Sequence, residues 1–450
     1  MTSYWPQSPA SCSDNVLPRD IAQRILAGDT SVLAGESASY RLGWLRHADN
    51  FDKLIERISP QIEPRHESTV LLGMGGSAAC AGMLLEAHRV DTVSILDTSF
   101  PDSLYSQDFE NVNVVVSSKS GGTIETVCAL AYALSNGLAP RDVTIVTDPG
   151  TSLEELGNSL GVRVIHGDQT TGGRFAALSA FGLVPALMAG LRPRQLEEWP
   201  VSDEVWCDAF ERGFNALQPD VAAQTVPLRD DPLVSWAAMW EEQLIAESTG
   251  KNGKGVIPLT GSRNDGESIQ ETHARVIGMC VALGVDPFNQ PDVERAKQQT
   301  FAVLGEGDVA FDAECETFDE AVSILSQSPR VPIAVEVFGP TSDPFVAPLR
   351  QWRDRARHDG LTPMAGFGPR YLHSTGQLLK GGPDSATLVQ VSVRPTSEPQ
   401  RISGRSYSFH DLVAAQRIGD RRAMKALGRA VVSVAVQNED ELASFLSQIG

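Results

Sequence analysis

The chain has 450 residues, of which 42% are hydrophobic, and a formal net charge of −20 at pH 7. The length predicts two or three domains, and the apolar content is enough for a sizeable core. The negative charge argues against a surface for nucleic acid or an anionic membrane, although local donors can still bind a small anion. No apolar run reaches the roughly 18 residues of a membrane span, and no signal-peptide pattern opens the chain, so we expect a cytoplasmic protein without a membrane partner.

From residue 69 onward, apolar runs of strand length alternate with helical patterns. The expected strands are 69–73, 92–97, 112–117, 142–148 and 162–168, and the expected helices are 77–88, 123–136 and 152–160. This alternation predicts a parallel sheet covered on both faces. Helical spacing also occurs before this unit, at 20–27 and 40–58, and after it, in the apolar segment 175–189.

The segment 191–200, LRPRQLEEWP, has two prolines and few strand-forming residues, so we expect the chain to cross between domains there. Beyond it, helices are expected at 202–217, 232–247 and 267–284, and strands at 256–259, 332–339, 386–393 and 430–436. The sequence thus predicts an α/β protein with an N-terminal arm (1–40), a first domain (41–190) and a less regular second domain (201–450).

The stretch 117–123, Ser-Ser-Lys-Ser-Gly-Gly-Thr, joins a predicted strand to a predicted helix. A helix N-terminus has unpaired N–H groups and a partial positive charge, and glycines let a ligand approach the backbone. Hydroxyls and one ammonium surround the same point, which favours a phosphate cradle. The plain alternative is a polar turn in which Thr123 caps the helix.

A second glycine-rich turn, LLGMGGSAAC at 71–80, also precedes a predicted helix. The glycines at 73 and 75, with Asp97 at the end of the next strand, fit a dinucleotide fingerprint, so a nucleotide-dependent oxidoreductase is one alternative. Ser77 at the helix start and the cradle at 117–123 favour a compact sugar phosphate instead, because parallel neighbouring strands deliver both loops to one sheet edge.

Three polar residues farther along are candidates for chemistry. Arg174 follows two glycines after a predicted strand, where its guanidinium can face an oxyanion or pair with Asp168. Gln243 and Glu247 are four residues apart and share a helix face. Glu247 falls near the helix C-terminus, where the macrodipole disfavours its negative charge, so it is a candidate proton carrier, although most such glutamates are merely solvated.

Two later loops add further candidates. Gln290 and Lys297 lie two turns apart on one face of the helix that follows Asp286-Pro-Phe-Asn. His373 lies in the polar, glycine-rich stretch 367–382, where a structural histidine is the plain alternative. No His, Cys and carboxylate set shows the spacing of metal ligands.

Together these motifs resemble glucose-6-phosphate isomerase. The resemblance is carried by LLGMGGSAA, SSKSGGTIET, GGRF, QLIAESTGKNGKG and FNQPDVERAK. The later stretches GFGPRYLHSTGQLLKGGP and FHDLVAAQRIGDRRAMKALG resemble the isomerase half of bacterial transaldolase–phosphoglucose isomerase fusions. The likeness runs from about Arg41 to the end of the chain. It implies two sugar-isomerase (SIS) domains with three-layer α/β/α architecture and parallel sheets.

The resemblance also implies residue roles in the interconversion of glucose 6-phosphate and fructose 6-phosphate. Glu247 would move a proton between C1 and C2, Arg174 would stabilise the cis-enediolate, and Lys297 with a histidine would serve ring opening. The residues expected to bind substrate are Gly76, Ser77, Ser118, Lys119, Ser120, Thr123, Gln243 and Gln290. No metal or organic cofactor is implied. The expected partners are a small sugar phosphate and a second copy of the chain, because such isomerases usually form homodimers that share a histidine.

The chain departs from the family pattern in ways that leave alternatives open. His373 follows Lys297, whereas His273 lies where the family histidine usually does; we favour His373. The stretch between the predicted strand 256–259 and helix 267–284 looks short, so we expect a shortened second domain. Asp292 would place a carboxylate near the phosphate. A binding protein with the SIS fold that does not turn over its sugar phosphate, or an isomerase of another sugar phosphate, is the alternative function.

Overall fold

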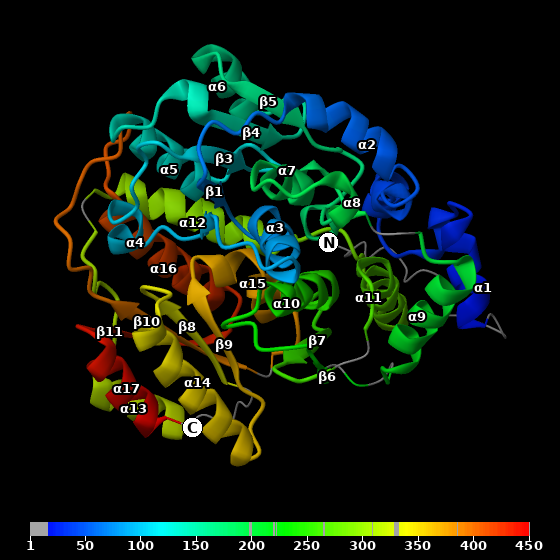
Figure 1. Ribbon diagram of the computed structural model, residues 1–450. Helices are drawn as coiled ribbons and strands as arrows, with labels where there is room; N and C mark the ends of the chain where they lie inside the picture. Colours follow the sequence, from blue (N-terminus) through cyan, green and yellow to red (C-terminus); the bar gives the residue numbers. More distant parts are fainter. Residues whose placement is uncertain are drawn as a thin grey trace, which may run out of the picture.

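The computed structural model describes residues 17–449 except 198–199, 219–220, 222, 264–265, 308, 328–332 and 385. Two parallel sheets lie one above the other in Figure 1, with helices between them and on their outer faces. Residues 1–16 of the expected N-terminal arm lie outside the described residues. The predicted α/β class with parallel sheets is confirmed.

The upper sheet has five parallel strands in the order β2-β1-β3-β4-β5. The strands are β1 (Thr69–Gly73), β2 (Val93–Leu96), β3 (Asn113–Ser117), β4 (Val143–Thr147) and β5 (Arg163–His166). Alternate side chains enter different cores: Leu71 and Val115 pack in one hydrophobic cluster, and Val70 and Val114 in another. All five strands lie where the apolar runs predicted them.

Helices cover both faces of this sheet. The face of Leu71 packs against α3 (Gly76–Ala87) and α7 (Ala180–Met188). The opposite face packs against α4 (Pro101–Tyr105), α5 (Ile124–Ser135) and α6 (Ser152–Leu160). The strands β1 and β3 both end next to a helix N-terminus, which places the two glycine-rich turns at one edge of the sheet.

The lower sheet has four parallel strands in the order β11-β10-β8-β9. They are β8 (Ile333–Phe338), β9 (Met364–Gly368), β10 (Thr387–Val393) and β11 (Ala430–Val436). The outer face carries α13 (Phe318–Ser326), α14 (Asp343–His358) and α17 (Glu439–Gln448), and the inner face carries α15 (Gly376–Gly381) and α16 (Phe409–Ala426). The strands β6 (Ala223–Pro227) and β7 (Gly255–Leu259) form a separate parallel pair. We had not expected β6 and β9.

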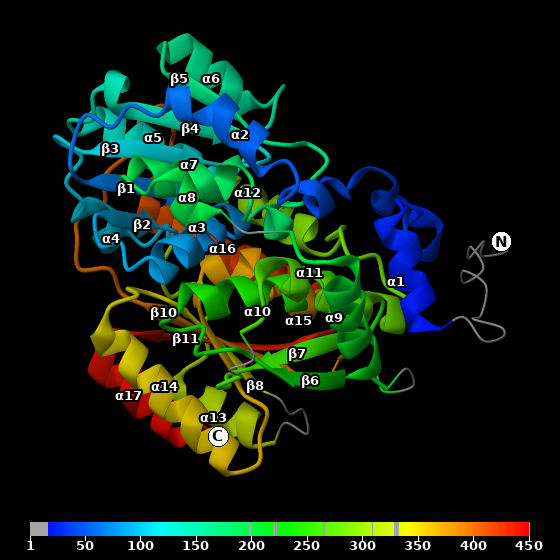
Figure 2. The same ribbon diagram turned by 45° about the vertical axis from the view of Figure 1, so that its right-hand side comes forward.

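Further helices lie beside and between the sheets: α9 (Asp203–Asn215), α10 (Trp236–Thr249), α11 (Ile269–Leu283) and α12 (Val293–Gly305). Figure 2 shows α1 (Pro18–Leu26) against α9, where Arg19 bonds Asp208. The segment that we expected to be an arm is therefore packed on the body of the protein from residue 18. The largest hydrophobic cluster contains residues from both sides of the expected domain boundary, and that boundary stays a prediction.

Two expected helices are shorter than their apolar patterns. The segment 40–58 contains a 3-10 turn (Gly43–Arg46) and then α2 (Phe51–Ile58), because the N–H of Gly43 donates to Thr170 O at 3.1 Å and fixes the chain on a loop. The expected helix 175–189 begins at residue 180, where Ser179 accepts from the N–H of Phe181. A tertiary hydrogen bond thus sets the start of the first helix, and a local hydrogen bond sets the start of the second.

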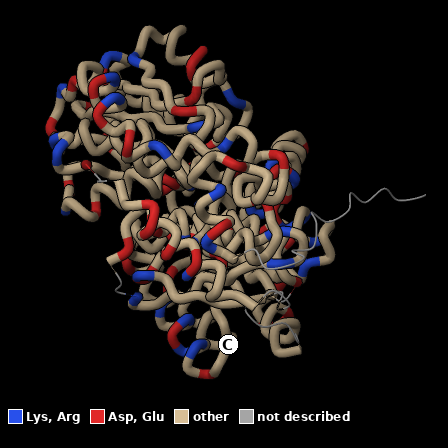
Figure 3. The backbone as a smooth tube through the Cα atoms, turned by 90° about the vertical axis from the view of Figure 1, so that its right-hand side faces the viewer, with Lys and Arg blue, Asp and Glu red and all other residues tan. Residues whose placement is uncertain are grey.

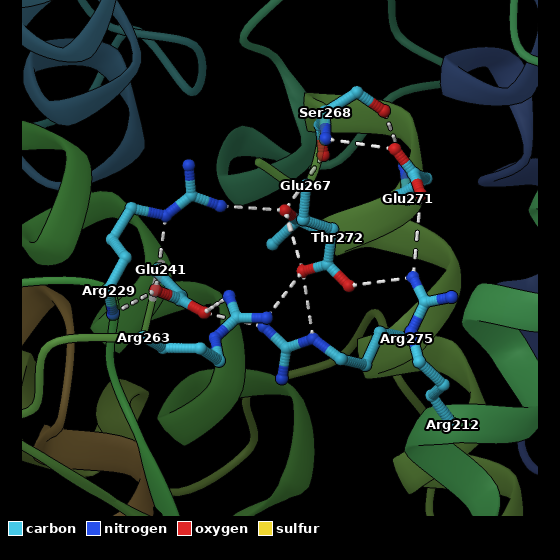
Figure 4. A network of polar contacts seen from close by, with 9 residues as sticks. All are labelled: Arg212, Arg229, Glu241, Arg263, Glu267, Ser268, Glu271, Thr272 and Arg275. Carbon is cyan, nitrogen blue, oxygen red and sulfur yellow. Dashed lines mark hydrogen bonds and ion pairs between the residues drawn. The ribbon is translucent and has the colours of Figure 1, made fainter. Parts of the chain in front are cut away.

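A buried polar network ties α10 and α11 to the loops that flank β6 and β7. Glu241 is fully buried, and its oxygens pair with Arg229, Arg263 and Arg275, as Figure 4 shows. Arg275 also bonds Glu267 at 3.0 Å. Because buried carboxylates are costly unless paired and hydrogen-bonded, this network fixes the crossing of the helices.

Charged residues of both signs lie along both halves of the backbone (Figure 3). Among the helices of the described residues, none combines the length and apolar character needed to span a bilayer.

The crossing of α9 and α11 offers a test of packing. A Cβ on Gly278 would lie 2.1 Å from Phe210 O, in the backbone of α9, whereas a Cβ on Gly305 meets nothing within 4 Å. We expect Gly278→Ala to lower the free energy of unfolding by about 1–3 kcal/mol through overpacking. Gly305→Ala, the matched control, should be neutral or stabilise by up to about 1 kcal/mol. Urea titrations compare the two, and equal stabilities would contradict the close crossing.

Candidate active site

A cavity of about 480 Å³ opens between the two halves of the chain, at the carboxyl edge of the upper sheet. Its lining includes most of the residues expected to form a site. These are Gly76, Ser77, Lys119, Ser120, Thr123, Arg174, Gln243, Glu247, Gln290, Lys297 and His373. Ser118 is buried behind this lining, where its hydroxyl lies 2.9 Å from that of Thr123. The structure therefore brings together residues that are up to 297 positions apart in the sequence, between Gly76 and His373.

Hydrogen-bond donors gather at one end of the cavity, where two helices begin. Ser77 lies in the first turn of α3, and Ser120 and Thr123 precede α5. A Cβ on Gly76 would lie 2.4 Å from Gly173 O, so glycine at this position lets the turn before α3 touch the loop that carries Arg174. The helix N-termini and hydroxyls form a site suited to an anion.

Lys119 is held at this end by a carboxylate and a carbonyl. Its ammonium contacts the Asp148 carboxylate and donates to Asp168 O at 2.7 Å. Burial lowers the pKa of Lys119 and raises that of Asp148, and their mutual attraction opposes both shifts. Asp148 is a site residue that the sequence analysis missed, although it follows β4 as the other site loops follow their strands.

Glu247 and Arg174 form a buried ion pair in the cavity wall. Arg174 Nη1 lies 2.9 Å from Glu247 Oε1, and the side chains are 3% and 7% exposed. Gln243 Nε2 donates to Glu247 Oε2 at 2.9 Å and to His373 O at 3.0 Å. Arg174 therefore pairs with Glu247, not with Asp168. Each carboxylate oxygen keeps a lone pair for a ligand.

The remaining donors of Arg174 fix its plane. Nε donates to Ser248 Oγ at 2.9 Å, and Nη2 donates to Pro287 O and Asn289 O at 2.8 and 3.1 Å. Behind this loop, Lys251 donates to Asp286 O, and burial lowers its pKa to about 7. The guanidinium is thus locked between α10 and the loop before α12.

Four buried acceptor atoms on residues that line the cavity have no hydrogen-bond partner among the described residues: Gln243 Oε1, Asn289 Oδ1, Glu125 Oε2 and Asp148 Oδ1. An unpaired buried acceptor is costly, and the amide oxygens of Gln243 and Asn289 are acceptors suited to hydroxyl donors of a ligand. Gln290 and Lys297 also line the cavity. Gln290 accepts a hydrogen bond from Arg174 at 3.0 Å, and Lys297 lies on α12 and is half exposed.

His373 enters the cavity from the loop after β9 and is paired with a buried carboxylate. Its Nε2 lies 2.8 Å from Glu125 Oε1. Because an ionised carboxylate only accepts, Nε2 carries the proton and Nδ1 remains for a ligand. Burial opposes ionisation of Glu125, but His373 outweighs it and holds the pKa of Glu125 below its usual range.

Gln416 on α16 completes this arrangement. Its amide donates to Glu125 Oε1, and its carbonyl oxygen accepts from Ser99 Oγ. The roles of Glu125 and Gln416 were not predicted from the sequence. A glutamate in the first helical turn after the 117–123 cradle was the available signal for Glu125; no signal existed for Gln416.

Two other residues that the sequence left as site candidates, His273 and Asp97, lie outside the cavity lining. His273 is buried between Trp44, Phe175 and Trp240, away from the cavity lining. Asp97 forms a 3.1 Å ion pair with Arg370, so it is not free to bind a ribose.

Asp292, which we expected near the phosphate, is absent from the cavity lining. Its carboxylate accepts from Gln377 at 2.7 Å, on the side of α15. The described residues hold no group of three or more His, Cys, Asp or Glu that could bind a metal ion.

The fold and the cavity define an α/β protein with two main parallel sheets, in which donors suited to an anion and a fixed carboxylate line the same cavity. No family model matches the chain. Glucose-6-phosphate isomerase from Clostridium perfringens (strain 13) is 26% identical over 290 residues, which is 54% of this chain and 64% of that protein. A probable glucose-6-phosphate isomerase from Methanococcus maripaludis is 26% identical over 238 residues, 47% of this chain and 54% of that protein. The chain thus matches less than two thirds of the length of these relatives.

Solved structures show a weaker likeness. A hypothetical protein from Thermus thermophilus has 18% sequence identity and a TM-score of 0.35, covering 96% of this chain and 86% of that chain. A glucose-6-phosphate isomerase from Chlamydia trachomatis has 15% identity and a TM-score of 0.25, covering 98% and 73%. At these TM-scores the structural likeness carries no argument.

The placement of His273 predicts a pH effect on stability. Burial lowers the pKa of His273 to about 3, so the unfolded chain binds a proton below about pH 6.5 that the folded chain does not. As the pH falls from 6.5 to 4, the free energy of unfolding of the wild type should therefore decrease by up to about 3 kcal/mol more than that of His273→Phe. Urea titrations across this range measure the difference. The exposed control His358→Gln should show the same pH dependence as the wild type. If the free energy of unfolding changed with pH in the same way for all three proteins, a buried neutral His273 would be contradicted.

Proposed function

We propose that this protein is a phosphosugar isomerase of the SIS type that interconverts glucose 6-phosphate and fructose 6-phosphate. The observation that carries the proposal is the buried Glu247 carboxylate, fixed by Arg174 and Gln243 and facing the same cavity as the anion subsite. The 26% identical relatives named glucose-6-phosphate isomerase support the same reaction.

In the proposed reaction the phosphate binds Ser77, Lys119, Ser120 and Thr123, which leaves the sugar carbons near Glu247. Glu247 removes the proton from C2 of the open-chain aldose and returns it to C1, so that one carboxylate serves both steps. The negative charge that develops on the enediolate oxygens is stabilised by Arg174, whose position is already fixed before the reaction. Sugar hydroxyls donate to Gln243 Oε1 and Asn289 Oδ1.

Ring opening precedes proton transfer and uses His373. Glu125 holds the Nε2–H of His373; in the imidazolium form the second proton is on Nδ1, which donates it to the ring oxygen and leaves a neutral imidazole still bonded to Glu125. Lys297, which lines the same cavity, assists from α12.

Replacement of Glu247 tests the proton transfer. Glu247→Gln keeps the shape and the contact to Arg174 but cannot take a proton, so turnover should fall by at least about a hundredfold. The assay converts fructose 6-phosphate and detects glucose 6-phosphate through its dehydrogenase. The variant should still gain thermal stability with fructose 6-phosphate, as the wild type does.

The matched control is Glu155→Gln, an exposed glutamate on α6, which should keep full turnover. A wild type that is stabilised by fructose 6-phosphate without turning it over would favour a sugar-phosphate-binding protein or an isomerase of another sugar phosphate. Full turnover in Glu247→Gln would remove the proposed mechanism.

Replacement of His373 tests ring opening. In His373→Ala, turnover of glucose 6-phosphate should be slower by about a hundredfold, and at high enzyme concentration the rate should level off at the spontaneous rate of ring opening. The wild-type rate should stay proportional to enzyme concentration over the same range. A His373→Ala rate that remains proportional at every concentration would assign His373 another role, and His358→Gln serves as the unaffected control.

A further inference from the structure

Within the described part of the chain, the charged side chains that line the cavity form pairs, with one exception. Each of the three carboxylates has a basic partner: Lys119 with Asp148, Arg174 with Glu247, and His373 with Glu125. Lys297 lies 3.4 Å from Glu294. Arg41 also lines the cavity, and no carboxylate of the described residues lies within ion-pair distance of its guanidinium. Among the residues that the structure describes, Arg41 is therefore the cation of the cavity lining that has no carboxylate within ion-pair distance.

Arg41 lies beside Lys119. Arg41 Nη1 donates to Gln169 O at 3.1 Å, and Lys119 Nζ donates to Asp168 O, the preceding carbonyl, at 2.7 Å. The lowering of the Lys119 pKa, which is due first to burial, is increased by the charge of Arg41. The two cations thus share the end of the cavity where the hydroxyls gather.

The segment that carries Arg41 is fixed in place. A Cβ on Gly43 would lie 2.0 Å from Thr170 Oγ1, so the chain passes directly over the 168–171 loop. The guanidinium lies over the ring of Tyr40, 5.2 Å from its centroid, and Tyr40 and Ser37 line the cavity as well. The position of the charge is therefore set before a ligand binds.

We propose that Arg41 is the second cation of the anion subsite and binds the phosphate group of the ligand together with Lys119. The proposal rests on the proposed function for the sugar part of the ligand, but the anion subsite stands on its own contacts. Asp148 pairs with Lys119, and the Asp168 carboxylate lies 3.5 Å from His47. Arg41 adds a second positive charge at this end of the cavity, which favours binding of a phosphate dianion in a chain of charge −20. Arg41, the first residue of the expected first domain, then completes the ligand site.

The test measures binding of inorganic phosphate by titration calorimetry, at constant ionic strength, to the full chain. Arg41→Gln keeps amide donors for the loop carbonyls but removes the charge, and we expect the dissociation constant to rise about tenfold, equivalent to about 1.4 kcal/mol. Arg41→Lys should keep most of the affinity. In a second series of titrations, the difference in phosphate affinity between the wild type and Arg41→Gln should decrease as salt is added, because salt screens the electrostatic attraction.

Arg46 provides the matched control, because it lies in the same segment, donates to a backbone carbonyl and points outward, 64% exposed. Arg46→Gln should bind phosphate like the wild type. Unchanged phosphate affinity in Arg41→Gln would overturn the proposal. The proposal would also be overturned if Arg41→Gln and Arg41→Lys lost phosphate affinity equally and both had lowered melting temperatures. That result would mean that Arg41 only holds the loop in place. Phosphate binding needs no turnover, so a failure of the isomerase assay leaves this result interpretable.

Discussion

The ion pair between Arg174 and Glu247 is the contact on which the geometry of the cavity depends. Glu247 belongs to α10, whereas Arg174 follows the upper sheet, so the pair joins two parts of the chain. The same guanidinium bonds the carbonyls of Pro287 and Asn289 before α12. Loss of one partner would leave a buried charge unpaired, at a cost of about 3–5 kcal/mol. One side chain therefore orders three segments at once.

Donors and acceptors both line the cavity, and some of the acceptors have no protein partner among the described residues. The hydroxyls and ammonium near α3 and α5 donate, whereas Gln243 Oε1 and Asn289 Oδ1 accept and have no protein partner among the described residues. A ligand with an anionic head and a hydroxylated body satisfies both groups in one orientation. In the orientation that we propose, the anionic head lies at the hydroxyls and the ligand carbons lie against Glu247.

Much of the fold followed from hydrophobic patterning. The five strands of the upper sheet were predicted because each is an apolar run, rich in β-branched residues, between turn residues. The strand β9, Met364-Ala-Gly-Phe-Gly, was missed because two glycines in five residues weaken the strand pattern. The start of the helix expected at residue 40 was wrong because Gly43 bonds a loop that is distant in the sequence.

The candidate site was predictable where chemistry follows directly after a strand. Ser77, Lys119 and Arg174 all lie in such loops or at the helix start that follows, and parallel strands bring these loops to one edge. Glu125 was not assigned a role, because its partners His373 and Gln416 are 248 and 291 residues away. Sequence spacing contains no information on such contacts. The homodimer likewise stays a prediction.

The pairing of His373 with Glu125 inside one chain has a kinetic consequence. In the arrangement that the family resemblance implied, a histidine arrives from a second chain, and its presence depends on protein concentration. Here the chain itself tethers the histidine, and Arg370 beside it is fastened to Asp97 at the end of the upper sheet. The effective concentration of this imidazole at the cavity is set by covalent connection, whether or not the expected homodimer forms.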